Sequence, residues 1–80
     1  MNVEAVKERL QAIRSEPDTQ DRAVMLQYMM QLPEPARRLL VARYYNRCSW
    51  SEIMDAQGYT GRQCKRRYSK ALKELARIIP

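Results

Sequence analysis

Five cationic side chains lie within residues 61–70, GRQCKRRYSK, and no acidic side chain lies among them. Arginine and lysine neutralise phosphates, and arginine, lysine and glutamine can also hydrogen-bond to base edges in DNA. The whole chain has fifteen cations against nine acids, a net charge of +6. Charge crowded into one short segment therefore indicates a polyanionic partner, provided that the side chains share one face.

The positive charge belongs to the second half of the chain. Residues 1–35 carry four cations and six acids, a net −2, whereas residues 36–80 carry eleven cations and three acids, a net +8. This asymmetry favours a polyanion-binding surface built from the second half.

The residues needed for metal binding or for catalysis are missing from the sequence. The chain has no histidine, and Cys48 and Cys64 are its only cysteines, so neither a zinc site nor a nucleophile–histidine pair can be assembled. No pair of carboxylates at a catalytic spacing is visible either. We therefore expect no enzyme, no catalytic residue, no metal and no cofactor. The two cysteines are expected to be reduced thiols that act as small hydrophobic side chains.

The ends of the chain and its apolar runs bear on location. The first residues, MNVEAVKERL, lack the apolar segment of a signal peptide, and no apolar run is long enough to span a bilayer. We expect a cytoplasmic protein without a membrane partner, associated with the nucleoid.

The elements that must position the cations are expected to be helices. The chain has only two glycines and no phenylalanine and is rich in good helix formers, so the fold class is predicted as all-α, with about five helices. Near residues 2–15, Val3, Val6, Leu10 and Ile13 form a narrow apolar stripe that closes before Pro17. Residues 1–17 are expected either to pack on the domain formed by residues 18–80 or to form the seam of a homodimer. We favour packing against the second helix; a dimer would prefer half-sites about one helical turn apart.

The middle helices are marked by cap residues and prolines. The second helix is predicted to begin at Asp18 as its N-cap. Pro35 suits the first turn of the third helix, whose buried face would be Ala36, Leu39, Leu40 and Tyr44.

Two capping boxes define the last two helices. Ser49 with Glu52 predicts the start of a short helix, Gly58 suits the left-handed position that ends it, and Thr60 with Gln63 starts the last helix. A short helix, a tight turn and a longer helix are the sequence form of a helix-turn-helix, with residues 61–77 as the recognition helix. At about 100° per residue from Gly61, the apolar residues of this helix fall between about 260° and 20°, and five cations fall between about 40° and 180°. Those cations are Arg62, Lys65, Arg66, Lys70 and Lys73. Arg67 lies at the edge of the apolar arc, where it is expected to snorkel or to contact the first half of the chain.

The positions of these residues predict their roles on double-stranded DNA. Base contacts come chiefly from the N-terminal part of a recognition helix, so the expected base-reading residues are Gly61, Arg62, Gln63, Lys65 and Arg66. Gly61 offers no side chain and would allow close approach to the helix N-terminus, which favours phosphate. The expected contacts to the DNA backbone are Tyr45, Arg47, Ser51, Thr60, Ser69, Lys70 and Lys73.

Residues 32–75 also resemble a known family, region four of bacterial sigma factors, and more closely the small region-four-like regulators of phages and mobile elements. The resemblance runs through Leu32-Pro33, Arg37-Arg38-Leu39-Leu40, Tyr44-Tyr45, Ser49-Trp50-Ser51-Glu52-Ile53-Met54, Gly58-Tyr59-Thr60 and Ser69-Lys70-Ala71-Leu72-Lys73-Glu74-Leu75. It implies a helical fold with a helix-turn-helix, binding of promoter or regulatory DNA, and base reading at Gly61, Arg62, Lys65 and Arg66. Gly61 stands where the family often has a large polar side chain, and Arg67 where it often has an aliphatic one. The melting and core-binding regions of a full sigma factor are not present in this sequence.

Aromatic and methionine side chains admit two interpretations. Tyr44, Tyr45, Trp50 and Tyr59 fit core positions of a helix-turn-helix better than stacking platforms for single-stranded nucleic acid. Met25, Met29, Met30 and Met54 fit either gap-filling core or a soft partner surface.

The leading hypothesis from the sequence is a sequence-specific, double-stranded DNA-binding transcriptional regulator. One alternative is a protein-interaction module that binds RNA polymerase or a sigma or anti-sigma partner through the first two helices. Another is the DNA-recognition subunit of a phage packaging or recombination complex.

Overall fold

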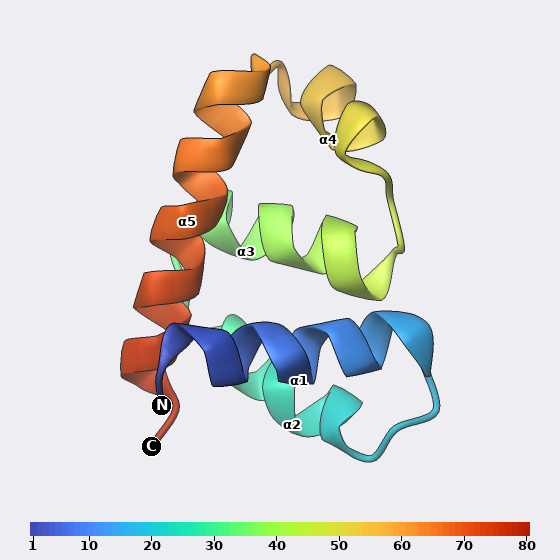
Figure 1. Ribbon diagram of the computed structural model, residues 1–80, viewed down its shortest axis with the longest axis vertical. Coiled ribbons are helices and arrows are strands. Elements are labelled where there is room, and N and C mark those ends of the chain that lie inside the picture. The colour runs from blue at the N-terminus through green and yellow to red at the C-terminus, as the bar shows by residue number, and fades with distance from the viewer.

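Five α-helices and one π-helical turn make up the computed structural model, which describes residues 1–80 (Figure 1). The α-helices are α1 (Val3–Ser15), α2 (Asp21–Met29), α3 (Glu34–Leu40), α4 (Trp50–Gln57) and α5 (Gly61–Ile78). The π-helical turn η1 (Val41–Tyr45) continues α3 without a break. There is no strand, so the predicted all-α class is confirmed. No helix combines the length and the apolar character needed to cross a membrane.

The predicted N-cap of the second helix, Asp18, is wrong by two residues, because the observed N-cap is Gln20. Asp18 lies in a turn, and α2 begins at Asp21, without a side-chain cap. This turn is stabilised by a hydrogen bond in which the Thr19 N–H donates to the Glu16 carbonyl at 3.1 Å. Asp21 is also fixed from outside, since its carboxylate accepts from Arg9 Nε of α1 at 2.7 Å. The first residue of α2 is thus the residue that contacts α1, and not the residue that follows the predicted cap.

The π-helical turn brings two consecutive tyrosines inward. Within η1 the Asn46 N–H donates to the Val41 carbonyl at 2.9 Å, a spacing of five residues instead of four. Tyr44 and Tyr45 are both buried, although neighbouring positions on an ordinary α-helix point about 100° apart. The sequence pattern of the third helix gave no sign of this turn.

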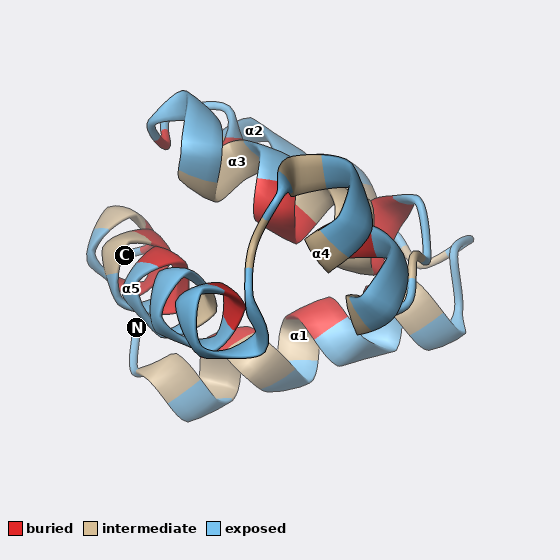
Figure 2. Ribbon diagram, turned by 90° about the horizontal axis from the view of Figure 1, so that it is seen from above, coloured by how far each residue is buried: buried red, intermediate tan, exposed pale blue.

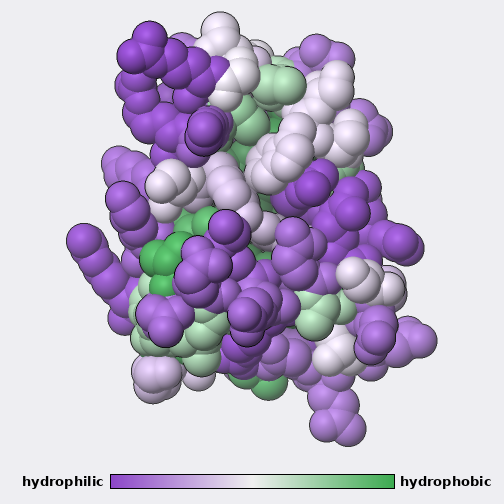
Figure 3. All heavy atoms as spheres, in the orientation of Figure 1, coloured by the Kyte–Doolittle hydropathy of each residue, from purple (hydrophilic) through white to green (hydrophobic).

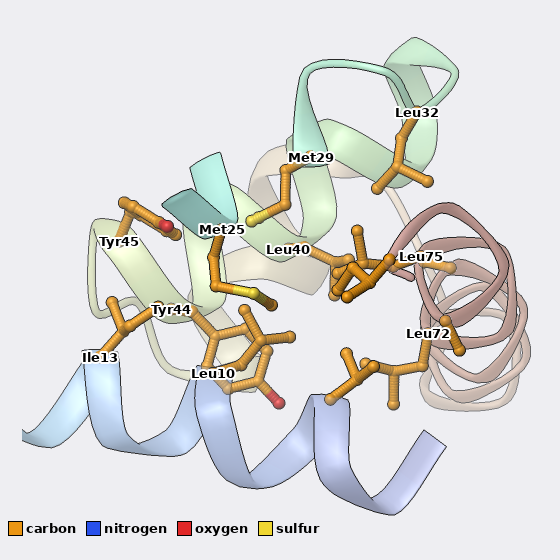
Figure 4. Close-up of a cluster of buried hydrophobic side chains, with 14 residues drawn as sticks. Leu10, Ile13, Met25, Met29, Leu32, Leu40, Tyr44, Tyr45, Leu72 and Leu75 are labelled. Carbon is orange, nitrogen blue, oxygen red and sulfur yellow. The ribbon is translucent and has the colours of Figure 1, made fainter. Parts of the chain in front are cut away.

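The apolar stripe of α1 closes the main core. Val6, Leu10 and Ile13 are fully buried, and α1 contacts α5 and η1 as well as α2. Figure 4 shows Leu10 and Ile13 beside Tyr44 and Met25, with Leu72 and Leu75 of α5 meeting the same cluster. The favoured packing of this helix against the second helix is present, but α1 also packs against α5 and η1, which the sequence analysis did not anticipate. In this chain Val6, Leu10 and Ile13 therefore belong to the same core as the rest of the molecule.

A second, smaller cluster holds α4 in place. Leu39 of α3, Ile53 of α4 and Cys64 of α5 are buried together. Trp50, Met54 and Tyr59 pack against them from the α4 side. Because this cluster joins three helices, it fixes the orientation of α4 relative to the N-terminal end of α5.

Candidate nucleic-acid interface

Both predicted capping boxes are present and define where α4 and α5 start. Ser49 Oγ accepts from the Glu52 N–H at 3.1 Å, and the Ser49 N–H donates to the Glu52 carboxylate at 2.9 Å. These bonds hold the pKa of the Glu52 carboxyl below its ordinary value. Thr60 Oγ1 accepts from the Gln63 N–H at 3.2 Å, and Gln63 Oε1 accepts from the Thr60 N–H at 3.0 Å. Each helix start therefore satisfies two of its free amide groups locally.

The turn between these helices uses a left-handed glycine. Gly58 has φ 70°, as predicted for the residue that ends α4. The Tyr59 N–H then donates to the Met54 carbonyl at 3.0 Å, which closes the last turn of α4. Only Tyr59 and Thr60 separate Gly58 from the first residue of α5, so the two helices are joined tightly.

The two faces of α5 are separate. Its buried residues, Cys64, Ala71, Leu72, Leu75 and Ala76, turn toward the interior, whereas its outer side is exposed (Figure 2). The five cations predicted to share a face are all exposed. We refer to Arg62, Lys65, Arg66, Lys70 and Lys73 as the basic face; together with Ser69 they line one shallow depression along α5. Figure 3 shows hydrophilic side chains at the upper left of the molecule, over the N-terminal part of α5.

The basic face is almost free of internal partners. Lys70 Nζ lies 4.0 Å from a Glu74 carboxylate oxygen, an exposed pair of the kind that contributes little to stability. Arg62, Lys65 and Arg66 form no ion pair or hydrogen bond through their side chains within the chain. Crowded, unpaired cations repel one another, so an external anion would stabilise them.

Arg67 is turned away from the basic face. Its guanidinium lies over the Tyr59 ring, 4.8 Å from the centroid. Arg67 therefore contacts the turn between α4 and α5, and it also lines a depression together with Pro33 and Pro35. A cation over a ring at an exposed site contributes on the order of 0.5–1 kcal/mol, which helps to hold Tyr59 beside the start of α5.

One predicted DNA contact has a structural role instead, and a second is partly engaged in a helix cap. Tyr45 is 9% exposed, its hydroxyl donates to the Arg22 carbonyl, and the Arg22 guanidinium lies 4.7 Å from its ring centroid. Burial raises the pKa of Tyr45 to about 12. Tyr45 is thus a core residue, and its assignment to the DNA backbone is corrected. Gln63 is exposed, but its carbonyl oxygen is committed to the helix cap, which leaves only the amide donors free.

The remaining predicted contact residues are exposed. They are Gly61 at the start of α5, Arg47 and Ser51 on either side of the start of α4, Thr60 in the turn, and Ser69 on α5. Arg47 has φ 58°, a left-handed conformation that is costly for a residue other than glycine. Its carbonyl accepts from Arg14 Nη2 at 3.4 Å.

Two arginines that the sequence analysis did not single out hold the loop before α4. Arg14 Nε donates to the Arg43 carbonyl at 3.0 Å, and Arg43 Nη1 donates to the Cys48 carbonyl at 3.2 Å. The Arg43 guanidinium also lies 4.5 Å from the centroid of the Trp50 ring. These two cations belong to the framework and not to the basic face. Only their three-dimensional neighbours distinguish them from the other arginines.

Aromatic side chains link the framework to α5. Tyr68 meets Trp50 edge-on, with centroids 4.8 Å apart, and its hydroxyl hydrogen-bonds to that of Tyr44. Burial is the main reason that the pKa of Tyr44 is raised well above its ordinary value. Tyr44 is buried, and Trp50 and Tyr59 are half-buried, so these rings pack within the fold as the preferred interpretation predicted.

Comparisons of the chain with protein-family models, with curated proteins and with solved structures found no match. No group of three or more His, Cys, Asp or Glu side chains is placed to hold a metal ion. The feature of this chain that bears most directly on function is therefore the basic face, through its geometry and charge.

Proposed function

We propose that the protein is a sequence-specific, double-stranded DNA-binding transcriptional regulator, with α4, the turn and α5 as a helix-turn-helix. The observation that carries this proposal is the basic face, where five exposed cations share one side of a helix whose other side is buried. Such a helix fits the major groove, which is wide enough to admit it. The tight turn and the two capping boxes support the same interpretation.

Each part of the interface has a proposed role. Arg62, Lys65 and Arg66, near the start of α5, would read base edges, while Gly61 would allow close approach of the backbone. Lys70 and Lys73 lie further along the helix and would neutralise phosphates, with Ser69 as an additional donor. Arg47, Ser51 and Thr60, around the starts of α4 and α5, would bind flanking phosphates.

The resemblance to sigma region four supports the regulatory part of the proposal. It covers residues 32–75, which include the basic face and both capping boxes. In this interpretation the protein resembles the small phage and mobile-element regulators of that family and acts at promoter or operator DNA.

Selection of bound duplexes from a random pool tests this proposal directly. We expect a defined sequence to be enriched, and the purified protein to bind it at least about a thousandfold more tightly than unrelated duplex at physiological salt. Enrichment of no sequence, or equal affinity for selected and unrelated duplexes, would contradict sequence-specific binding.

A specific observation favours a second candidate function, binding to RNA polymerase or a sigma or anti-sigma protein. Val24 and Leu26 of α2 and Met30 at its C-terminal end are 44%, 37% and 58% exposed. Ala23 and Gln27 are also exposed, and no residue from 23 to 30 is charged. An uncharged apolar surface on a chain of net charge +6 fits a protein partner better than DNA.

Purified RNA polymerase separates the two functions. Val24→Lys with Met30→Lys should abolish binding to polymerase if the α2 surface is the contact, and should leave affinity for the selected duplex within about threefold. Unchanged polymerase binding by this variant, or none by the wild-type protein, would remove the second candidate.

A further inference from the structure

An apolar groove of about 360 Å³ lies between α4 and α5, beside the basic face. It is lined by Trp50, Met54, Gly61, Cys64, Lys65 and Tyr68. Lys65 belongs both to this lining and to the basic face, so the groove opens next to the proposed base-reading side chains. Figure 3 shows the corresponding apolar surface between the N-terminal end of α5 and α4.

Gly61 lines this groove without a side chain. A β-carbon at position 61 would have Met54 Sδ as its nearest neighbour, at 3.9 Å, an ordinary van der Waals distance. Packing therefore does not require glycine here, and Gly61 has no positive φ that would require it either. The absence of a side chain at position 61 leaves a space at the N-terminal end of α5, next to the proposed interface.

The chemistry of the lining narrows what can occupy the groove. Its walls are two aromatic rings, a thioether and a thiol, with one ammonium group at the edge and no acid. The edges of base pairs in the major groove present hydrogen-bond donors and acceptors, and the C5-methyl group of thymine is the one apolar group among them. An apolar wall beside Arg62 and Lys65 has no other complement in that groove.

We propose that this groove receives the C5-methyl group of a thymine, and that Met54 and Gly61 are thereby specificity-determining positions. The inference rests on the proposed function, because it requires α5 to lie in the major groove. Lys65, at the edge of the groove, would bind an acceptor on the same or the adjacent base pair. One polar and one apolar contact would then recognise the same base-pair step.

Replacement of thymine by deoxyuridine tests the inference, because it removes only the methyl group and preserves base pairing. Each thymine of the selected duplex is replaced in turn, and binding by the wild-type protein is measured. We expect at least one replacement to weaken binding about fourfold, the effect of removing one buried methyl group. If every replacement changes affinity by less than about 1.5-fold, or if the selected site contains no thymine, the inference is wrong while the proposed function stands.

Met54→Gln locates the contact, with Met30→Gln as its matched control on the exposed end of α2. Met54→Gln should reduce the preference for thymine over uracil at the sensitive position to about one, whereas Met30→Gln should leave it near fourfold. Circular dichroism checks that both variants remain helical, and the deoxyuridine scan of the wild-type protein needs no variant. An unchanged preference in Met54→Gln would place the methyl contact elsewhere, and failure of selection itself would remove the proposed function together with this inference.

Discussion

Arg66 and Lys70 are exposed one helical turn apart on the basic face, yet their surroundings predict different effects on DNA binding. Arg66 has no partner in the chain and lies near the N-terminal end of α5, where a guanidinium can bind guanine through two hydrogen bonds. Arg66→Ala should therefore weaken binding to the selected duplex by about 1–3 kcal/mol and relax the preference at one base pair. Competition against single-base variants of the site measures this effect.

Lys70→Ala provides the contrasting result. It should weaken binding to selected and unrelated duplexes alike and reduce the slope of log affinity against log salt by about one. The exposed pair with Glu74 is too weak to hold Lys70 away from phosphate. If Lys70→Ala changed base preference while Arg66→Ala did not, the two assignments would have to be exchanged.

The cysteines should differ in reactivity. Cys64 is 4% exposed and burial raises the pKa of its thiol, whereas Cys48 is half-buried. Because the thiolate is the reactive form, Cys64 in the native protein at pH 8 should be alkylated by iodoacetamide at least about tenfold more slowly than Cys48. Single Cys→Ser variants report each rate separately, and the two rates should converge in urea. Equal rates in the native protein would show that the cluster around Cys64 opens readily.

The starts of α4 and α5 could be predicted from the sequence because the interactions that define them are local. A capping box joins residues three apart, so Ser49, Glu52, Thr60 and Gln63 carry the whole signal in their spacing. The same holds for Gly58, whose left-handed conformation follows from its position between two helices. The start of α2 was missed because Asp21 is held by Arg9, a residue twelve positions away. The π-helical turn was missed because what fixes it is the burial of both Tyr44 and Tyr45 in the tertiary core.

Thr60→Ala tests the cap of α5 as an element. Loss of the Thr60 side chain leaves the Gln63 N–H without its acceptor, and the free energy of unfolding should fall by about 1 kcal/mol. Ser69→Ala is the control, since Ser69 is exposed in the middle of α5 and caps nothing; its effect should stay within about 0.5 kcal/mol. Urea denaturation followed by circular dichroism measures both. Equal effects of the two changes would contradict the capping role.

At the scale of the whole molecule, α1 and α2 are joined by an ion pair that should make stability depend on pH. The hydrogen bonds from Arg9 hold the pKa of the Asp21 carboxyl below its ordinary value of about 3.9. A lowered pKa in the folded state stabilises the protein above that ordinary value, and this contribution is lost as pH falls below about 4 through the folded pKa.

Asp21→Asn should therefore lower the free energy of unfolding at pH 7 by about 1 kcal/mol, because the pair is half-exposed and screened by solvent. The difference from wild type should shrink toward pH 2. Urea denaturation at both pH values measures it, and Glu8→Gln, at an exposed acid without a partner, should show little difference. A difference that persists unchanged at pH 2 would assign the effect of Asp21→Asn to something other than its charge.

The separation of the apolar and basic faces of α5 could also be predicted from the sequence, because it follows from the helical repeat alone. The sequence did not predict which of the remaining cations hold the fold together and which are free on the surface. Arg14 and Arg43 look like the other arginines in the chain, and only the carbonyls and the ring around them assign them to the loop before α4. The helical repeat set Arg67 apart from the basic face, but it did not predict the contact with Tyr59. Tyr45 was misplaced for the same reason, since its hydroxyl partner, the Arg22 carbonyl, lies on another helix.

The central claim is that the basic face of α5 binds duplex DNA, and one comparison of two charge-matched variants tests it most directly. Arg62, Lys65 and Arg66 are replaced together by alanine in the first variant, and Lys7, Arg37 and Arg38, on α1 and α3, in the second; each then has a net charge of +3 instead of +6. Affinity for the selected duplex is measured at one salt concentration, with circular dichroism to verify helical content. We expect the first variant to lose specific binding, at least about a hundredfold, and the second to remain within about tenfold of wild type. Equal losses by the two folded variants would contradict the assignment of the interface to α5.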